Sequence, residues 1–462
     1  MPDPVLSSYI VAPFCFEVGG VLSPISIRDQ MIRSSLVVDR AWQRGIIGPA
    51  RPLLIVGAGA AGATGAIRAA QLGVRTVLIE KSLAPFSRQA GCHTRFIDPT
   101  QYDWPVDHWN QGCFPWKITP PMSPMPLPWT AAPANRLAIV WRNTLNKARV
   151  RFARILSVYY DTYLLCPPTP HGTLVEPTFS RFVPVKQFGA VLSTVGFGTE
   201  ICTLGRFSGF RFWDADQLQH PTLGLNAGSK LRVLISGGGD GSLQDFIRIL
   251  TTRSPGEIYE GLPIDERTRT ETERRLHSAE DQAQRAHIWA TENHDHEIYE
   301  RLDKQYQTQV QRLRFEKSLW SDIVEYLDKI VRRSQRTEMV FHCTHFSRCY
   351  GLNRFVSLLL AAYLGNRAKV KVLYPNTVVH SIVGESPHSC RGDAVDCYGK
   401  EHAVVFRSAS CPGISRISTI KPDSTYDVIV LRHGVRPPYT IFQSTLLPVN
   451  PPRHVIPYYS PW

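Results

Sequence analysis

The sequence predicts an α/β protein built on two parallel β-sheets, with a charged helical segment inserted in the second. Two segments consist of an apolar strand, a glycine-rich turn and a helix, one beginning at Leu53 and the other at Leu231. Elsewhere short apolar strands alternate with helical stretches, a pattern typical of parallel sheets. At 462 residues, of which 43% are hydrophobic, the chain is long enough for two such domains at roughly 100 to 200 residues each.

Composition and charge narrow the class of protein. The longest plainly apolar stretch, Phe355 to Leu364, is far shorter than the roughly 20 residues of a membrane span. Met1 to Pro13 has no basic region ahead of an apolar core, so no secretory signal is expected. The 10 irregularly spaced cysteines indicate reduced thiols, and we expect a cytoplasmic protein. The net charge of +13 favours phosphate-rich partners such as dinucleotides, whereas no motif indicates nucleic acid.

We expect the chain to divide into four parts. Residues 1–50 form an N-terminal extension whose helix, Ser26 to Arg44, packs on the first domain, which spans residues 51–225. Residues 226–440 form the second domain, and residues 441–462 form a C-terminal tail. The expected strands are Leu53–Val56, Arg75–Ile79, Ala190–Thr194, Leu231–Ser236, Met339–His342, Lys371–Tyr374 and Val428–Leu431.

Two stretches within these domains are unusual in composition. The prolines of residues 115–133 remove backbone donors and exclude a regular helix, so we expect a surface excursion there. Residues 257–337 are dense in charge and predict a helical insertion. Apolar residues four apart, such as Ile298, Leu302 and Tyr306, predict amphipathic helices with one buried stripe. The stripe packs either on its own domain or on a protein partner that residues 264–336 would contact.

The first glycine-rich turn carries every element of a dinucleotide-binding fingerprint. Four apolar strand residues precede Gly57, Gly59 and Gly62, and a helix follows. Gly57 allows the tight turn, Gly59 lets the backbone approach a pyrophosphate, and Gly62 lets the helix pack close to the strand. The N-terminal amides of the helix then favour the phosphates. The alternative to a dinucleotide-binding site is a glycine turn at the start of a helix that binds no ligand.

A second strand follows and ends at Glu80, 18 positions beyond Gly62. An acid at this place accepts hydrogen bonds from ribose hydroxyls. Its negative charge disfavours a 2′-phosphate, so FAD or NAD fits better than NADP at this turn.

These 30 or so residues resemble the flavoproteins with two dinucleotide-binding domains, the glutathione-reductase-like and flavin-monooxygenase-like enzymes. The resemblance implies two Rossmann-like domains, with the FAD pyrophosphate at the first glycine-rich turn and the adenosine ribose at Glu80. The expected cofactor-binding residues of this domain are Gly57, Gly59, Ala60, Ala61, Gly62, Glu80, Lys81, Gln89 and Arg95.

The second glycine-rich turn looks like the one that opens the nicotinamide-nucleotide domain of the same flavoproteins. Gly237 and Gly239 occupy the first two fingerprint positions, whereas Ser242 replaces the third glycine. The expected NAD(P)-binding residues are Gly237, Gly238, Gly239 and Asp240. A structural turn is the alternative, because Asp240 and Asp245 would repel phosphate if they pointed inward.

The segment from Arg88 to Trp104 follows the first dinucleotide fingerprint, where the chain of the resembled family approaches flavin or substrate. Arg95 is a candidate for a phosphate, Gln89 for ribose, and Tyr102 with Trp104 for stacking on a planar ring. Cys92 and His93 suggest redox or acid/base chemistry, and loop packing is an equally good interpretation. No closely spaced cysteine pair occurs near the flavin position, which argues against a disulfide oxidoreductase.

A cluster of nitrogen and sulfur donors occurs at His342, Cys343, His345 and Cys349, but we expect no metal there. His342 and Cys343 are predicted to end a strand, which would place neighbouring side chains on opposite faces. A loop in which His345, Ser347 or Arg348 contacts a ribose or 2′-phosphate is the better interpretation.

The leading hypothesis for function is an FAD-dependent oxidoreductase that passes hydride from NAD(P)H to flavin and then to an unknown substrate or to oxygen. The residues that would act on the substrate cannot be named from the sequence. The alternative is a dinucleotide-binding sensor or adaptor without catalysis, which contacts a protein through its helical insertion.

Overall fold

A computed structural model describes residues 3–436 apart from 19–25, 107–112, 115–125, 128, 197, 217, 220–230, 290–294, 333–334, 348, 368–370, 384–401 and 410–424. The chain forms two compact units. The first contains Met1–Pro99, Gly112–Thr199 and Val435–Trp462, and the second contains Thr100–Gln111 and Glu200–Gly434. The predicted tail at 441–462 and most of the predicted excursion at 115–133 lie outside the described residues.

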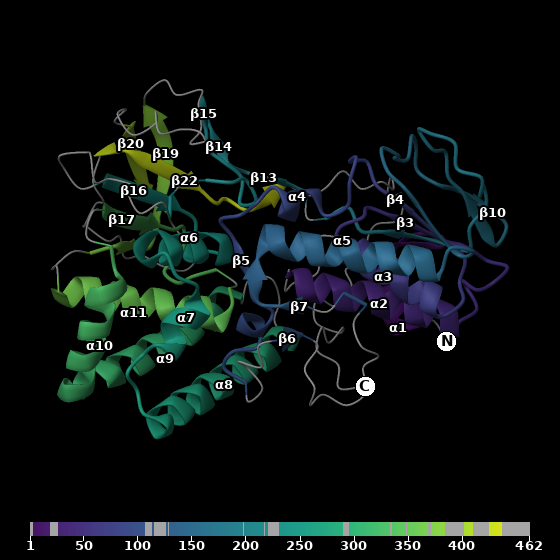
Figure 1. Cartoon of the computed structure of the whole chain (residues 1–462). Helices are drawn as coiled ribbons and strands as arrows, with labels where there is room; N and C mark the ends of the chain where they lie inside the picture. Colours follow the sequence, from purple (N-terminus) through teal and green to yellow (C-terminus); the bar gives the residue numbers. More distant parts are fainter. Residues whose placement is uncertain are drawn as a thin grey trace. The chain divides into compact units, whose positions relative to one another are not determined.

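The first unit is built on a six-stranded sheet with the order β1-β2-β12-β3-β4-β9, of which Figure 1 labels β3 and β4. All neighbouring strands are parallel except β1 and β2, which are antiparallel. All four residues of each of β3, β4 and β12 are buried, as parallel strands covered on both faces require. The strands are β1 (Ile10–Ala12), β2 (Cys15–Glu17), β3 (Leu53–Val56), β4 (Thr76–Ile79), β9 (Leu156–Tyr159) and β12 (Ala190–Ser193).

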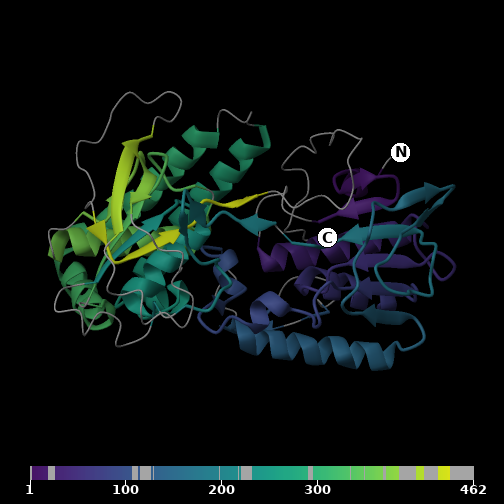
Figure 2. The same ribbon diagram turned by 90° about the horizontal axis from the view of Figure 1, so that it is seen from above.

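Helices α2 (Ile27–Gln43), α3 (Ala60–Gln71) and α5 (Ala134–Arg151) lie side by side in this unit, and Figure 2 shows α5 in blue. The helix predicted at Ser26 to Arg44 is confirmed. The Ser26 hydroxyl accepts from the Asp29 N–H and caps α2, and Arg44 ends the helix. A Cβ at Gly65 of α3 would overlap the Ser34 hydroxyl, so α2 and α3 approach very closely. The N-terminal segment also adds two strands, and is therefore more than a helix packed on the domain.

The second unit contains a four-stranded parallel sheet with the order β18-β17-β16-β22. Its two inner strands, β16 and β17, are covered on both faces. Helices cover one face, whereas a three-stranded antiparallel sheet lies over the other, through a cluster that includes Leu234, Val379 and Val404 (Figure 1). The parallel strands are β16 (Leu231–Ser236), β17 (Gln335–Val340), β18 (Leu373–Tyr374) and β22 (Val428–Leu431), and the antiparallel ones are β19 (Thr377–Val383), β20 (His402–Ser408) and β21 (Thr425–Tyr426).

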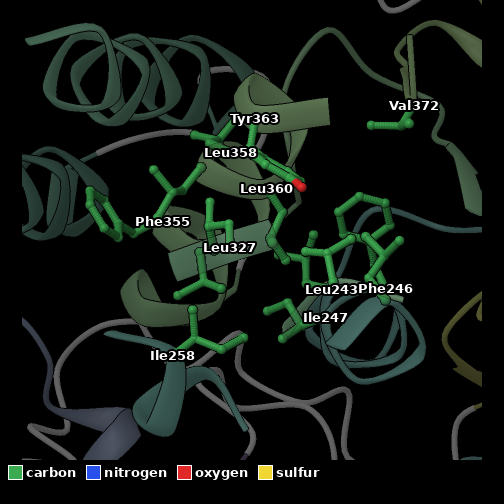
Figure 3. Close-up of a cluster of buried hydrophobic side chains, with 14 of the residues drawn as sticks. Leu243, Phe246, Ile247, Ile258, Leu327, Phe355, Leu358, Leu360, Tyr363 and Val372 are labelled. Atoms are coloured by element: carbon green, nitrogen blue, oxygen red, sulfur yellow. The ribbon is translucent and has the colours of Figure 1, made fainter. Parts of the chain in front are cut away.

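The charged insertion between α6 and β17 is helical, and its apolar stripe is buried within its own unit. Ile298, Leu302, Tyr306 and Val310 are all at most 5% exposed. Figure 3 shows Leu243, Phe246 and Ile247 of α6 in one cluster with Leu358 and Leu360 of α11, together with Leu327 of the insertion. The helices are α6 (Asp240–Thr251), α7 (Pro255–Glu260), α8 (Glu266–Trp289), α9 (Asp295–Phe315), α10 (Lys317–Ile330) and α11 (Gly351–Arg367).

An ionic network joins this insertion to α11. Arg354 of α11 is fully buried and lies 2.8 Å from Asp303 of α9 and 3.7 Å from Glu280 of α8. The Tyr306 hydroxyl donates to Glu280 at 2.6 Å. Removing Arg354 would leave the buried Asp303 carboxylate without its ion-pair partner, and breaking a buried pair in this way typically costs about 3–5 kcal/mol.

These findings confirm the predicted fold class, two parallel α/β sheets with an inserted helical segment. The division between the units differs in position from the expected boundary at 225. It falls between Thr199 and Glu200, because Phe207 and Phe210 pack in the two cores of the second unit. None of the helices in the described residues is long and apolar enough to cross a membrane.

The remaining elements are short. They are α1 (Pro4–Ser7), α4 (Ser87–Ala90), the 3-10 helix Thr100–Tyr102, and the strands β5 (Phe96–Ile97), β6 (Cys113–Phe114), β7 (Trp129–Thr130), β8 (Ala132–Pro133), β10 (Thr169–His171), β11 (Leu174–Glu176), β13 (Thr199–Glu200), β14 (Thr203–Leu204), β15 (Phe207–Ser208) and β23 (Val435–Arg436).

Candidate functional site

The first glycine-rich turn follows β3 directly and begins α3. Gly57 has a φ of +102°, a conformation that favours glycine, and its N–H donates to the Ile79 carbonyl at 2.8 Å. A Cβ at Gly62 would overlap the Gly57 carbonyl oxygen, so the first turn of α3 packs directly on the loop. Both glycines therefore have the backbone roles that the sequence predicts for them.

Gly59 has a different environment from the other two glycines. It precedes α3 with an extended backbone, φ −76° and ψ −172°, and supplies no side-chain cap. A Cβ at this position would meet no atom within 4 Å. The N–H groups of the first turn of a helix have no partner within the helix, so those of α3 remain for an acceptor that approaches Gly59.

Thr194, at the end of β12, supports this turn and was missed by sequence reasoning. Its hydroxyl lies 2.9 Å from the carbonyl oxygens of both Val56 and Gly57, and its N–H donates to Val56. The sequence signal was the strand at Ala190 to Thr194, which was recognised, although its final hydroxyl was not assigned a role.

Glu80 is half-buried at the end of β4 and lies against the same turn. Its Oε2 accepts from the Ala58 N–H at 2.6 Å, and its Oε1 accepts from the Ser82 N–H at 2.8 Å. A carboxylate has about four lone-pair positions, so each oxygen retains one for a further donor such as a ribose hydroxyl.

The other residues predicted to bind a cofactor in this unit have varied positions. Ala60 and Ala61 form the first turn of α3, and Lys81 is exposed next to Glu80. Gln89 lies half-buried in α4. Arg95 is 3% exposed, and its carbonyl oxygen accepts from the Ala134 N–H.

The second glycine-rich turn has the same backbone plan between β16 and α6. Gly237 has a φ of +142°, and its N–H donates to the Val340 carbonyl at 2.9 Å. Gly239 precedes α6 without a side-chain cap, and a Cβ there would meet nothing within 4 Å. Ser242 takes the place of the third glycine, and a Cβ at Gly237 would overlap its hydroxyl oxygen.

The two acidic residues beside this turn make contacts within the protein. Asp240 accepts from the Tyr350 N–H at 2.9 Å and from the Asn353 side chain at 2.8 Å, at the start of α11. Burial raises the pKa of Asp240 to about 6, against the opposing effect of these hydrogen bonds. Asp245 is fully buried between two arginines, Arg248 at 2.7 Å and Arg432 at 2.8 Å. Its charge is therefore neutralised locally.

The structure corrects the prediction that Trp104 stacks on a ligand ring. Trp104 is 2% exposed in the core of the second unit, where its ring lies 5.1 Å from Tyr259 and 5.3 Å from Phe355. Its segment, Thr100–Gln111, belongs to the second unit and was assigned to the first from its position in the sequence. Tyr102 packs on Tyr350, at 4.5 Å between ring centres.

Polar side chains also meet at the carboxyl ends of the strands in the second unit. Ser236, at the end of β16, lies 2.8 Å from the Nε2 of His433, which follows β22. His345 follows β17 and lies 3.3 Å from His296 of α9. Sequence reasoning identified neither pair, because each joins residues that are far apart in the chain.

No protein-family model and no curated protein matches the sequence. Among solved structures, the chain is similar to a Lactococcus lactis thioredoxin reductase, with 9% identity over 83% of this chain and 77% of that one and a TM-score of 0.34. The chain is also similar to a bacillithiol disulfide reductase from Staphylococcus aureus, with 12% identity over 85% of this chain and 79% of that one and a TM-score of 0.40. The open structure of a cyclohexanone monooxygenase has 11% identity over 84% of this chain and 74% of that one, with a TM-score of 0.34. These similarities are too low to indicate an activity.

Proposed function

We propose that the chain is a cytoplasmic FAD-dependent oxidoreductase that accepts hydride from NAD(P)H. The observation that carries the proposal is the geometry of the first turn, in which Gly59 opens onto free space at an uncapped helix start while Glu80 is fixed beside it. A ribose followed by a pyrophosphate suits this combination of carboxylate and helix amides.

The residues of the first unit fit the ADP half of FAD. The N–H groups of Ala60 and Ala61 would receive the pyrophosphate, and the remaining lone pairs of Glu80 would accept from the ribose. When bound, FAD would supply the redox chemistry, since its flavin ring accepts hydride. The protein would hold the dinucleotide and exclude a 2′-phosphate at Glu80 by charge.

The second turn is the proposed NAD(P)H site. The free space at Gly239 and the uncapped start of α6 support this assignment. The neighbouring acids do not oppose it, because Asp245 is paired with two arginines and Asp240 accepts hydrogen bonds from residues at the start of α11.

The first experiment is an absorbance spectrum of the purified protein, followed by anaerobic addition of NADH and NADPH separately. Flavin bands that bleach with one nucleotide support the proposal and identify the donor. A colourless protein that stays colourless after incubation with FAD would contradict it.

A pair of matched variants tests which turn binds FAD and which binds NAD(P)H. Gly59→Val and Gly239→Val both place a side chain in free space, at a cost of about 1 kcal/mol for a poorer helix cap. We expect Gly59→Val to lose flavin. We expect Gly239→Val to keep flavin and to lose bleaching by NAD(P)H. Gly48→Val is the control, because that position is also open and lies away from both turns. Normal flavin content in Gly59→Val would reject the site.

The alternative is a sensor that binds a dinucleotide without turnover and contacts a protein through residues 264–336. The apolar stripe of these helices is buried in their own unit, so a partner would meet their charged faces. Flavin that is retained but never bleaches with either nucleotide would favour this alternative over the oxidoreductase.

A further inference from the structure

Three side chains of types that can bind a metal ion meet beside the sheet of the second unit. Cys343 and His345 lie on the loop that follows β17, and His296 lies in the first turn of α9. The His296 Nδ1 is 3.3 Å from the His345 Nε2 and 3.7 Å from the Cys343 Sγ. One donor atom from each of the three residues lies within 4.8 Å of the other two.

The two separations from the His296 Nδ1 match edges of a zinc tetrahedron. Zinc binds imidazole nitrogen at about 2.0–2.1 Å and thiolate sulfur at about 2.3 Å, which for a tetrahedral angle gives about 3.3 Å between two nitrogens and about 3.6 Å between nitrogen and sulfur. The observed 3.3 Å and 3.7 Å agree with these two edges, and the third edge, between Cys343 and His345, is at most 4.8 Å.

The ring of His345 is oriented as in metal-binding histidines. Its Nδ1 lies 2.8 Å from the Phe346 carbonyl oxygen. A carbonyl oxygen only accepts, so Nδ1 carries the proton and the Nε2 lone pair is directed to His296. The N–H of the same Phe346 donates to Asp303 at 2.7 Å, and Asp303 is paired with the buried Arg354. The ligand loop is therefore fixed by the network that also holds α9.

We infer that His296, Cys343 and His345 bind one Zn²⁺ ion, with a fourth position open to water or a small ligand. Among the described residues, no fourth side chain has a donor atom within 4.8 Å of all three, although the His342 Nδ1 lies 3.5 Å from the Cys343 Sγ. Cys343 and His296 are partly exposed, which leaves a path for the ion. The site is distinct from the proposed flavin site and does not depend on it.

The zinc would join the helical insertion to the loop at the carboxyl end of β17. Cys343 and His345 belong to the loop whose Ser347 N–H donates to the Gly238 carbonyl at 2.9 Å. A metal that links this loop to α9 would therefore help to hold the second glycine-rich turn in place.

The test uses the full chain, purified without a histidine tag, treated with a chelator and then titrated with Zn²⁺ against a chromophoric zinc indicator. We expect about one Zn²⁺ per chain, and affinity at least about 10-fold weaker in His296→Gln and in Cys343→Ser. The controls, His380→Gln and Cys166→Ser, remove exposed residues of the same types outside the cluster and are expected to bind like the original protein.

A second measurement does not depend on affinity. Zn²⁺ should protect Cys343, and not Cys166, from alkylation by iodoacetamide, as mapped by mass spectrometry. It should also raise the melting temperature of the original chain but not of His296→Gln, whose metal-free melting temperature shows that it has folded. Equal zinc affinity in the ligand variants and the controls, or alkylation of Cys343 unchanged by zinc, would overturn the site.

Discussion

Glu80 and Ala58, 22 residues apart, are joined by a hydrogen bond of 2.6 Å from the Ala58 N–H to the Glu80 Oε2. The bond ties the end of β4 to the glycine-rich turn that follows β3. The carboxylate thus has a structural role in addition to the proposed ribose contact, and a test of the second role has to account for the first.

We expect Glu80→Gln to weaken FAD binding by roughly 10- to 100-fold. The amide oxygen of Gln can replace one carboxylate oxygen as an acceptor. Its NH₂ group takes the place of the other oxygen and faces the N–H of either Ala58 or Ser82. One charge-assisted hydrogen bond, of about 1.5–3 kcal/mol, is therefore lost. The measurement is titration of the flavin-free protein with FAD, followed by flavin fluorescence.

Glu176→Gln is the matched control for this prediction. Glu176 lies on the exposed hairpin of the same unit, where it accepts from the Gln187 side chain. Melting temperatures of the flavin-free variants separate a loss of the loop contact from a loss of the ligand contact. An FAD affinity of Glu80→Gln within twofold of the original would exclude the ribose role.

Gly62→Ala is expected to destabilise the first unit by about 2–3 kcal/mol, or roughly 4–12 °C in melting temperature, whether or not a cofactor binds. The added methyl group would overlap the Gly57 carbonyl oxygen and approach the Thr194 hydroxyl, and both belong to the rigid turn. Gly59→Ala, three residues earlier and in open space, should melt within about 1 kcal/mol of the original. Thermal denaturation of the flavin-free proteins tests both, and equal destabilisation would show that α3 does not pack on the turn in this way.

Features encoded locally could be predicted from the sequence. In each unit, the strand, the glycines and the helix that follows them are predicted by apolar runs and backbone requirements over some 30 residues, and the structure has all of them in place. The stripe of Ile298, Leu302 and Tyr306 likewise predicted which face of α9 is buried.

Features that depend on long-range packing could not be predicted. His296 meets His345 only because α9 folds back on the loop after β17, and the sequence shows no relation between residues 49 positions apart. Trp104 follows the first dinucleotide fingerprint in the chain yet packs with Tyr259 and Phe355 of the second unit. Trp104 was assigned to the first unit from its position along the chain. That assignment is wrong because residues 100–111 interrupt the first unit and belong to the second.

The stability of the second unit should depend on the charge of Asp240. Burial raises the pKa of this carboxyl to about 6 in the folded chain, against its ordinary value of 3.8. The folded chain thus binds a proton between about pH 4 and pH 6 that the unfolded chain releases. The contribution of Asp240 to stability is complete below pH 4 and is lost as the pH rises through 6, by about 3 kcal/mol in total.

Asp240→Asn removes this titration and keeps an acceptor for the Tyr350 N–H and the Asn353 side chain. We therefore compare the melting temperature of Asp240→Asn minus that of the original protein at two pH values. We expect this difference to rise by on the order of 5 °C from pH 4.5 to pH 7.5. Asp265→Asn should show a small change of opposite sign, because hydrogen bonds from Thr268 lower the pKa of that exposed carboxyl. Its stabilising effect is present at neutral pH and is lost in acid. Parallel curves for Asp240→Asn and the original protein would mean that Asp240 titrates alike in the folded and unfolded chains, and that the start of α11 does not enclose it.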